Sequence, residues 1–154
     1  MARTDVRSLV DEVIEAREAL LARARSLSES RIYGRTSRPG WTLKHELSAV
    51  AAADGELLHV LGELARDATV PPEGFDLRRR FGEAMHAMQE LRLSAVVERL
   101  EAGGAEIVEG LRAHGALLDR PLRIAGREVG SAAELAQAHV ERVHEAVATL
   151  DEHA

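Results

Sequence analysis

The sequence predicts an all-α fold: a bundle of four long helices with one short extra helix and a small turn or ribbon before the last helix. Apolar residues recur at three- and four-residue steps over four long stretches, which is the period of a helix with one buried face. Hydrophobic residues make up 45% of the chain and aromatic residues only 3%, a balance that favours close-packed helices over sheets. Segments containing Pro and Gly separate the stretches.

Length and charge limit the architecture and the partners. A chain of 154 residues is long enough for one hydrophobic core, so we predict a single domain over residues 1–154. The net charge of -6 argues against nucleic acid as a partner, and the run Arg78-Arg79-Arg80 is interpreted as a solvated face. No stretch is apolar enough to span a membrane and no leader peptide is expected after Met1, so a cytoplasmic location is predicted.

The residue content excludes several kinds of site. The chain has no cysteine, so a disulfide, a cysteine-ligated zinc and a thiol nucleophile are all excluded. The glycine-rich phosphate-binding patterns and the G-x-S-x-G nucleophile turn do not occur. The high content of Ala and Arg favours a GC-rich bacterial source.

The first helix is predicted to begin at Thr4 or Asp5 and to fade near residues 28–30. Either residue can cap a helix, and Asp5 favours its positive end. The apolar stripe contains Val6, Leu9, Val10, Val13, Ile14, Leu20, Leu21, Ala24 and Leu27. Arg17 falls on this stripe, so its guanidinium group either reaches outward along its stem or points into a cavity.

The second helix follows a loop at residues 32–40 and is predicted to begin after Thr42. Its stripe alternates steps of four and three, as in a helix packed at a shallow angle in a bundle. The stripe contains Leu43, Leu47, Val50, Asp54, Leu57, Leu61 and Leu64. Because a lone buried carboxylate is costly, Asp54 either finds a partner or lines a wet pocket. Trp41 is expected to anchor the helix entry, with its indole N–H bonded to a nearby carbonyl.

A linker, a short helix and a third long helix are predicted in the middle of the chain. The linker covers residues 68–74 and the short helix residues 75–90. Ser94 is expected to cap the long helix, and Pro121 to stop it. Gly103 and Gly104 each cost roughly 1 kcal/mol relative to Ala inside a helix. They indicate either a close helix crossing or room for a ligand.

A ribbon around Gly126 is predicted over residues 122–129, ahead of the last helix. Ser131 and Glu134 form a capping-box pattern. The stripe of the last helix contains Leu135, His139, Val143, Ala146, Val147 and Leu150, so the His139 ring is expected to point inward. A metal site in a bundle commonly takes two ligands one turn apart, but the residue one turn after His139 is Val143.

The entry of the predicted second helix has the sequence Pro39-Gly40-Trp41-Thr42-Leu43-Lys44. This segment, followed by a long amphipathic helix, resembles the second-helix entry of the DinB/YfiT-like superfamily. The segment Ala138-His139-Val-Glu-Arg-Val143-His144 agrees, and the helix order matches over nearly the whole chain. The resemblance implies a DinB-like bundle related to the N-terminal domains of mycothiol-dependent maleylpyruvate isomerases. Metal-binding members bring three histidines together, at positions that here hold Ala49, His139 and Val143. The resemblance therefore implies a degenerate three-histidine metal site.

Three functional hypotheses follow. The first is a divergent DinB-like protein without metal or other cofactor that binds a small molecule in the bundle. Its pocket residues would be Trp41, His45, Ala49, Asp54, His139 and Val143.

The second hypothesis is an active transferase, isomerase or hydrolase that uses a divalent metal, zinc or nickel, or a mycothiol-type thiol. Its metal ligands would be His139 and His45, with Asp54 or Glu56 as a third, and His139 could instead act as a general base. A Ser48–His139–Asp54 triad is a further alternative that the content allows. The third hypothesis is a non-catalytic dimerisation module that forms a homodimer.

Overall fold

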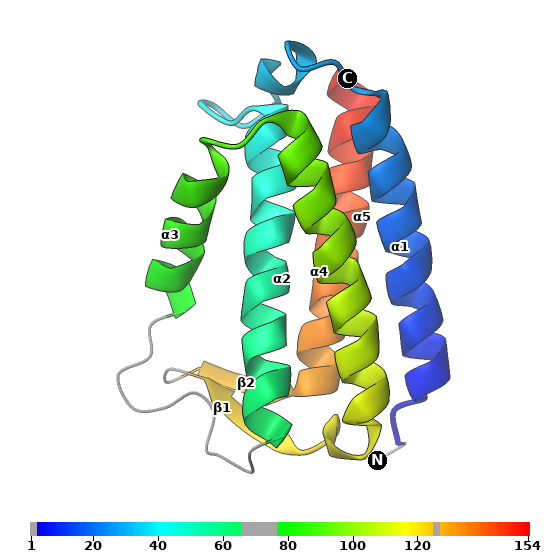
Figure 1. Cartoon of the computed structure of the whole chain (residues 1–154). Helices are drawn as coiled ribbons and strands as arrows, with labels where there is room; N and C mark the ends of the chain where they lie inside the picture. Colours follow the sequence, from blue (N-terminus) through cyan, green and yellow to red (C-terminus); the bar gives the residue numbers. More distant parts are fainter. Residues whose placement is uncertain (1–2, 66–76, 125–126) are drawn as a thin grey trace.

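The structure is a computed structural model that describes residues 3–65, 77–124 and 127–154. Four long helices form a bundle, and a short helix packs on its outside (Figure 1). The helices are α1 (Val6–Ser26), α2 (Leu43–Ala65), α3 (Leu77–Met88), α4 (Leu93–Ala113) and α5 (Ala132–His153). The strands are β1 (Pro121–Ile124) and β2 (Arg127–Ser131), which pair antiparallel. The predicted all-α bundle with a short extra helix and a small ribbon is confirmed.

The long helices form a ring in the order α1, α4, α2, α5, and each packs against its two neighbours. In Figure 1, α1 and α5 run upward while α2 and α4 run downward. The helices α2 and α4 run in the same direction because the chain turns back through α3, which packs against α2. As a consequence, α1 and α2 stand at opposite corners of the bundle, and a contact between them must cross its centre.

Local side chains begin three of the four long helices as predicted. Asp5 accepts a hydrogen bond from the Ser8 N–H at 3.1 Å to start α1. Thr42 accepts one from the His45 N–H at 3.2 Å to start α2. Ser131 accepts one from the Glu134 N–H at 3.2 Å to start α5. Each satisfies an N–H group that the helix itself leaves without a partner.

The predicted ends of α4 are wrong at both termini. The helix begins at Leu93, one residue before Ser94, and the Glu29 carboxylate accepts the Leu93 N–H at 3.0 and 3.1 Å. A distant side chain therefore takes the place of a local cap. The helix ends at Ala113 and continues into a 3-10 turn, Gly115–Leu117, so Pro121 begins β1 rather than stopping a helix.

The apolar stripes of the long helices meet in one core. Fully buried members include Leu20, Leu47, Val50, Val96, Leu100, Ile107, Leu111, Ala136 and Ala146. The predicted linker at residues 68–74, residues 75–76 of the predicted short helix, and Gly126 lie outside the described residues.

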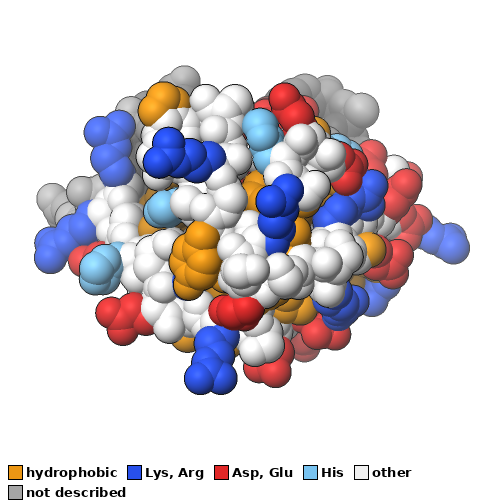
Figure 2. All heavy atoms as spheres, turned by 90° about the horizontal axis from the view of Figure 1, so that it is seen from above, with side chains coloured by type: hydrophobic (Ala, Val, Ile, Leu, Met, Phe, Trp, Pro, Cys, Tyr) orange, Lys and Arg blue, Asp and Glu red, His pale blue; other side chains and the backbone are white. Residues whose placement is uncertain are grey.

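The described surface is largely polar. Tyr33 is the only exposed large hydrophobic side chain among the described residues. Seen from above, Figure 2 shows Lys and Arg side chains interspersed with Asp and Glu side chains. None of the described helices has an apolar stretch long enough to cross a membrane.

Candidate functional site

An ion pair lies at the centre of the bundle. Arg17 of α1 donates two hydrogen bonds to Asp54 of α2, from Nη1 to Oδ2 at 2.9 Å and from Nη2 to Oδ1 at 2.5 Å. His139 of α5 lies on the same carboxylate, with Nε2 at 2.6 Å from Oδ1. The Arg17 Nη1 also donates to the Leu100 carbonyl of α4 at 3.1 Å. All four long helices therefore contribute to one cluster, called here the Arg17–Asp54–His139 cluster.

Burial makes this cluster energetically important. The exposed fractions of Arg17, Asp54 and His139 are 5%, 3% and 6%. A two-pronged guanidinium–carboxylate pair is a strong, directional contact, and breaking a buried pair by removing one partner typically costs about 3–5 kcal/mol. Asp54 thus finds partners, and the Arg17 guanidinium group points inward; both were open alternatives in the sequence.

The glycine pair of α4 makes room for this cluster. A Cβ atom on residue 103 would lie 3.0 Å from the Asp54 carboxyl carbon. A Cβ atom on residue 104 would lie 2.8 Å from the Arg17 Cγ. Gly103 and Gly104 therefore accommodate two charged side chains of the protein itself, rather than a ligand or the backbone of a neighbouring helix.

His139 meets the central ion pair through Nε2, which also lies 3.3 Å from the Arg17 Nη2. At 2.6 Å, Nε2 must share a proton with the Asp54 Oδ1, because two bare lone pairs would repel each other at that distance. The carboxylate therefore orients the imidazole through Nε2–H. The other ring nitrogen, Nδ1, is buried and has no hydrogen-bond partner among the described residues. A buried polar atom without a partner costs about 1–3 kcal/mol, so Nδ1 is the ring position whose hydrogen-bonding capacity the described residues leave unused.

A pocket adjoins His139 between α2 and α5. Its volume is about 240 Å³, and it is lined by Ala53, Glu56, Leu57, Leu135, Ala138, His139 and Arg142. The wall combines apolar and charged side chains, so it suits a small molecule of mixed polarity. The Arg142 guanidinium also lies 5.6 Å from the centre of the Phe81 ring of α3.

Of the six predicted pocket residues, only His139 lines this pocket. Asp54 contacts the His139 ring but does not line the pocket itself. Trp41 and His45 lie instead at the start of α2. The His45 Nδ1 accepts the Thr42 N–H at 3.0 Å, and its ring stacks on Trp41 with centroids 5.1 Å apart. The Trp41 indole N–H donates to the Glu46 carboxylate at 2.8 Å. The prediction that it bonds a carbonyl is wrong, because Glu46 stands one turn on and offers a charged acceptor.

The remaining predicted residues are apolar or engaged elsewhere. Ala49 and Val143 are buried at 3% and 2% exposure. The Ser48 hydroxyl donates to the Lys44 carbonyl at 2.7 Å and accepts from the Gln89 side chain at 3.2 Å. It lies six residues, or about 9 Å along the helix, from Asp54, so the Ser48–His139–Asp54 triad is not assembled.

The structure does not bring the predicted ligands His45, His139 and Asp54 together as a metal site. His45 stands nine residues before Asp54, about 13 Å along α2, and its Nδ1 already caps the helix. Both Asp54 oxygens accept hydrogen bonds from Arg17, and a cation there would have to displace a guanidinium group of the same charge. Within the described ranges, no group of three His, Cys, Asp or Glu side chains is placed to hold an ion.

Sequence reasoning missed four apolar lining residues and Arg142 of the pocket. Leu57 and Leu135 belong to the apolar stripes of α2 and α5, and Ala53 and Ala138 stand beside these stripes, so all four look like ordinary core or edge positions. Arg142 lies one turn after Ala138, and that spacing was the available signal.

Comparison with protein-family models and with curated protein sequences found no match. Solved structures do share the fold. Mycothiol-dependent maleylpyruvate isomerase superposes with a TM-score of 0.77 at 13% identity, over 97% of this chain and 63% of that one. This chain thus spans less than two thirds of the isomerase.

A second solved structure covers a protein of similar length. The colibactin self-resistance protein ClbS, in complex with a dsDNA, superposes with a TM-score of 0.77 at 14% identity, over 96% of this chain and 93% of that one. A protein from Streptococcus pneumoniae gives a TM-score of 0.63 at 13% identity. At these identities the likeness establishes the DinB-like helical fold, as the sequence resemblance predicted.

Proposed function

We propose that this chain is a DinB-like protein without a central metal that binds a small molecule beside His139. One observation carries the proposal. His139 is one of the residues that line the pocket, its Nε2 is held by Asp54, and its buried Nδ1 has no partner among the described residues. Such preorganisation favours binding because the ring loses no further rotational freedom when a ligand arrives.

The geometry suggests the class of ligand. With the proton on Nε2, Nδ1 offers a lone pair, so the ligand should present an O–H or N–H donor. The volume of about 240 Å³ lies below the roughly 300–1,000 Å³ of ordinary ligand pockets. A compact molecule with one donor and a small apolar body fits best.

A fragment screen by ligand-observed NMR tests this binding. We expect hits enriched in hydroxyl, amide and ammonium donors, and we expect His139→Leu to abolish them. The control is His144→Leu on the exposed side of the same helix, which should leave binding unchanged. Hits that bind equally well to both variants would overturn the proposal.

The absence of a central metal is tested separately. Elemental analysis of untagged protein should give far less than one ion per chain, and added zinc or nickel should leave the melting temperature unchanged. Stoichiometric zinc, nickel or iron that is lost in His139→Ala would favour the metal-dependent enzyme instead.

A second candidate is an enzyme in which His139 acts as a general base. The Asp54–His139 contact favours it, because a carboxylate that orients an imidazole is a recurrent arrangement in proton transfer. Turnover of an ester, lactone or thiol-transfer substrate that is lost in His139→Gln but retained in His144→Gln would support this candidate.

A further inference from the structure

A second pocket lies on the opposite side of the cluster, between α1 and α4. Its volume is about 340 Å³, within the usual range for ligand pockets. The side chains of Val13, Ile14 and Val108 form an apolar middle. Gly104 also lines this groove, where it lies against the Arg17 side chain.

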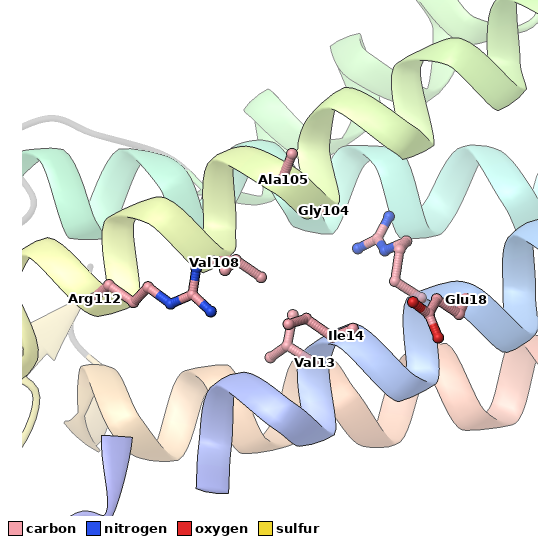
Figure 3. A pocket seen from close by; sticks show the side chains of 8 residues that line it. Val13, Ile14, Glu18, Gly104, Ala105, Val108 and Arg112 are labelled. Carbon is pink, nitrogen blue, oxygen red and sulfur yellow. The ribbon is translucent and has the colours of Figure 1, made fainter. Parts of the chain in front are cut away.

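The two ends of this groove carry opposite charges. Figure 3 shows Arg112 of α4 at one end and Glu18 of α1 at the other, with Val13, Ile14 and Val108 between them. Neither charged side chain forms a hydrogen bond or ion pair with another described residue. Arg17 also lines the groove, but its charge is already neutralised by Asp54.

The helix geometry sets the length of an occupant. The helices α1 and α4 run in opposite directions, and Gly104 lies beside Arg17, so Glu18 is level with the Gly104 turn of α4. Arg112 is eight residues further, a rise of about 12 Å. Because both side chains can lean inward, a chain of several methylene groups can join the two charges.

We propose that this groove binds a small zwitterion. Its carboxylate pairs with Arg112, its ammonium group pairs with Glu18, and its apolar spacer lies on Val13, Ile14 and Val108. A planar guanidinium suits a carboxylate, and burial of the spacer adds about 0.8 kcal/mol per methylene group that is fully removed from water. This proposal is independent of the pocket beside His139.

Three matched probes test the charge pattern: 6-aminohexanoate, hexanoate and hexylamine. Titration of the full ¹⁵N-labelled chain should shift the amides of residues 13–18 and 104–112, with 6-aminohexanoate binding tightest. Each singly charged probe should bind up to about fivefold more weakly, which is the upper end of the range for an exposed ion pair.

Two variants assign the ends of the groove. Arg112→Gln should weaken 6-aminohexanoate and hexanoate but not hexylamine, and Glu18→Gln should weaken 6-aminohexanoate and hexylamine but not hexanoate. Arg99→Gln and Glu15→Gln on the same helices are the controls, and both should bind like the parent protein. Equal binding of all three probes, no response to either variant, or no shift in this region at several tens of millimolar would overturn the proposal.

Discussion

At the scale of single residues, three buried polar side chains distinguish the centre of the bundle from its apolar surroundings. Arg17, Asp54 and His139 each sit where the helical period would otherwise place an apolar residue. Each is at least 94% buried, from exposures of 5%, 3% and 6%. Such a cluster is tolerated only because every charge in it meets a partner.

Asp54→Asn should destabilise the fold by about 3–5 kcal/mol, because it leaves the Arg17 guanidinium buried without a counter-charge. Urea unfolding followed by circular dichroism measures the change. Asp151→Asn, which removes an exposed partner of Arg23, should barely move the urea midpoint. A midpoint for Asp54→Asn close to that of the parent would mean that the buried pair is not formed.

Replacing both charges should recover much of that loss. An Arg17→Met, Asp54→Leu double variant removes the uncompensated charge and supplies apolar volume, and such exchanges are often neutral or stabilising. The double-mutant cycle should therefore show strong coupling. Additive losses would contradict a direct contact between the two side chains.

The sequence placed Asp54 and His139 in one pocket and left the direction of Arg17 open, but it did not predict that the three side chains meet. Asp54 interrupts the stripe of α2, Arg17 interrupts that of α1, and His139 points inward from α5. Their meeting depends on the ring order of the helices and on their axial register. The period of apolar residues indicates which face of one helix is buried. It indicates neither the order of the helices around the ring nor their axial register.

At the scale of elements, α4 is shaped by its neighbours more than by its own sequence. Its first N–H is bound by Glu29, and two glycines in its interior make room for the central ion pair. The local signals at Ser94 and at the glycines could be seen in the sequence, but their interpretation needed the side chains that pack against them.

Gly103→Ala should destabilise the protein, although Ala favours a helix by about 1 kcal/mol over Gly. Its Cβ would lie 3.0 Å from the Asp54 carboxyl carbon and push against the ion pair. The control is Gly55→Ala on α2, where a Cβ meets nothing within 4 Å, so the melting temperature should rise. If both variants are stabilised alike, the close approach of α4 to Asp54 is wrong.

A hydrogen-bond pair ties the start of α1 to the turn after α4. The Thr4 hydroxyl and the Thr4 N–H, the latter at 2.8 Å, both donate to the Asp119 carboxylate. These bonds lower the pKa of Asp119 from its ordinary value, and the bond from the Thr4 hydroxyl has the larger effect. A lowered pKa in the folded state means that this contact contributes fully above the ordinary carboxyl pKa and is lost as the pH falls through the lowered value.

Thr4→Val removes the hydroxyl donor, so the pKa of Asp119 should rise toward its ordinary value. Carboxyl ¹³C NMR across an acid titration measures it directly. Thr36→Val, whose hydroxyl bonds the Trp41 carbonyl, is the control and should leave the Asp119 titration unchanged. The same titration curve in Thr4→Val and in the parent would remove the proposed cause.

At the scale of the whole molecule, the chain has the bundle fold of the solved neighbours and a buried Arg17–Asp54–His139 cluster at its centre. The fold resembles proteins whose sequences differ at more than four fifths of positions, so it does not depend on the identity of most individual side chains. For this reason the fold could be predicted from sequence. The resemblance did not predict the polar interior, because the positions that it implies are Ala49, His139 and Val143 and include neither Arg17 nor Asp54.

The surface bears on the expected homodimer. Among the described residues, Tyr33 alone is a large hydrophobic side chain left exposed, so a dimer would form through charged helix faces or through residues outside the described ranges. Light scattering at two salt concentrations separates these cases. A dimer held by charged faces should dissociate as salt rises, and a salt-resistant dimer would point to an apolar interface.

The orientation of His139 is the central claim, because the pocket, the buried carboxylate and the proposed function all depend on it. Long-range ¹H–¹⁵N NMR of the histidine side chains reports which ring nitrogen carries the proton. The account predicts that the His139 Nε2 is protonated while Nδ1 has the shift of a bare nitrogen, and that Asp54→Asn disturbs this pattern whereas His144→Leu does not. A neutral His139 with its proton on Nδ1 would contradict it.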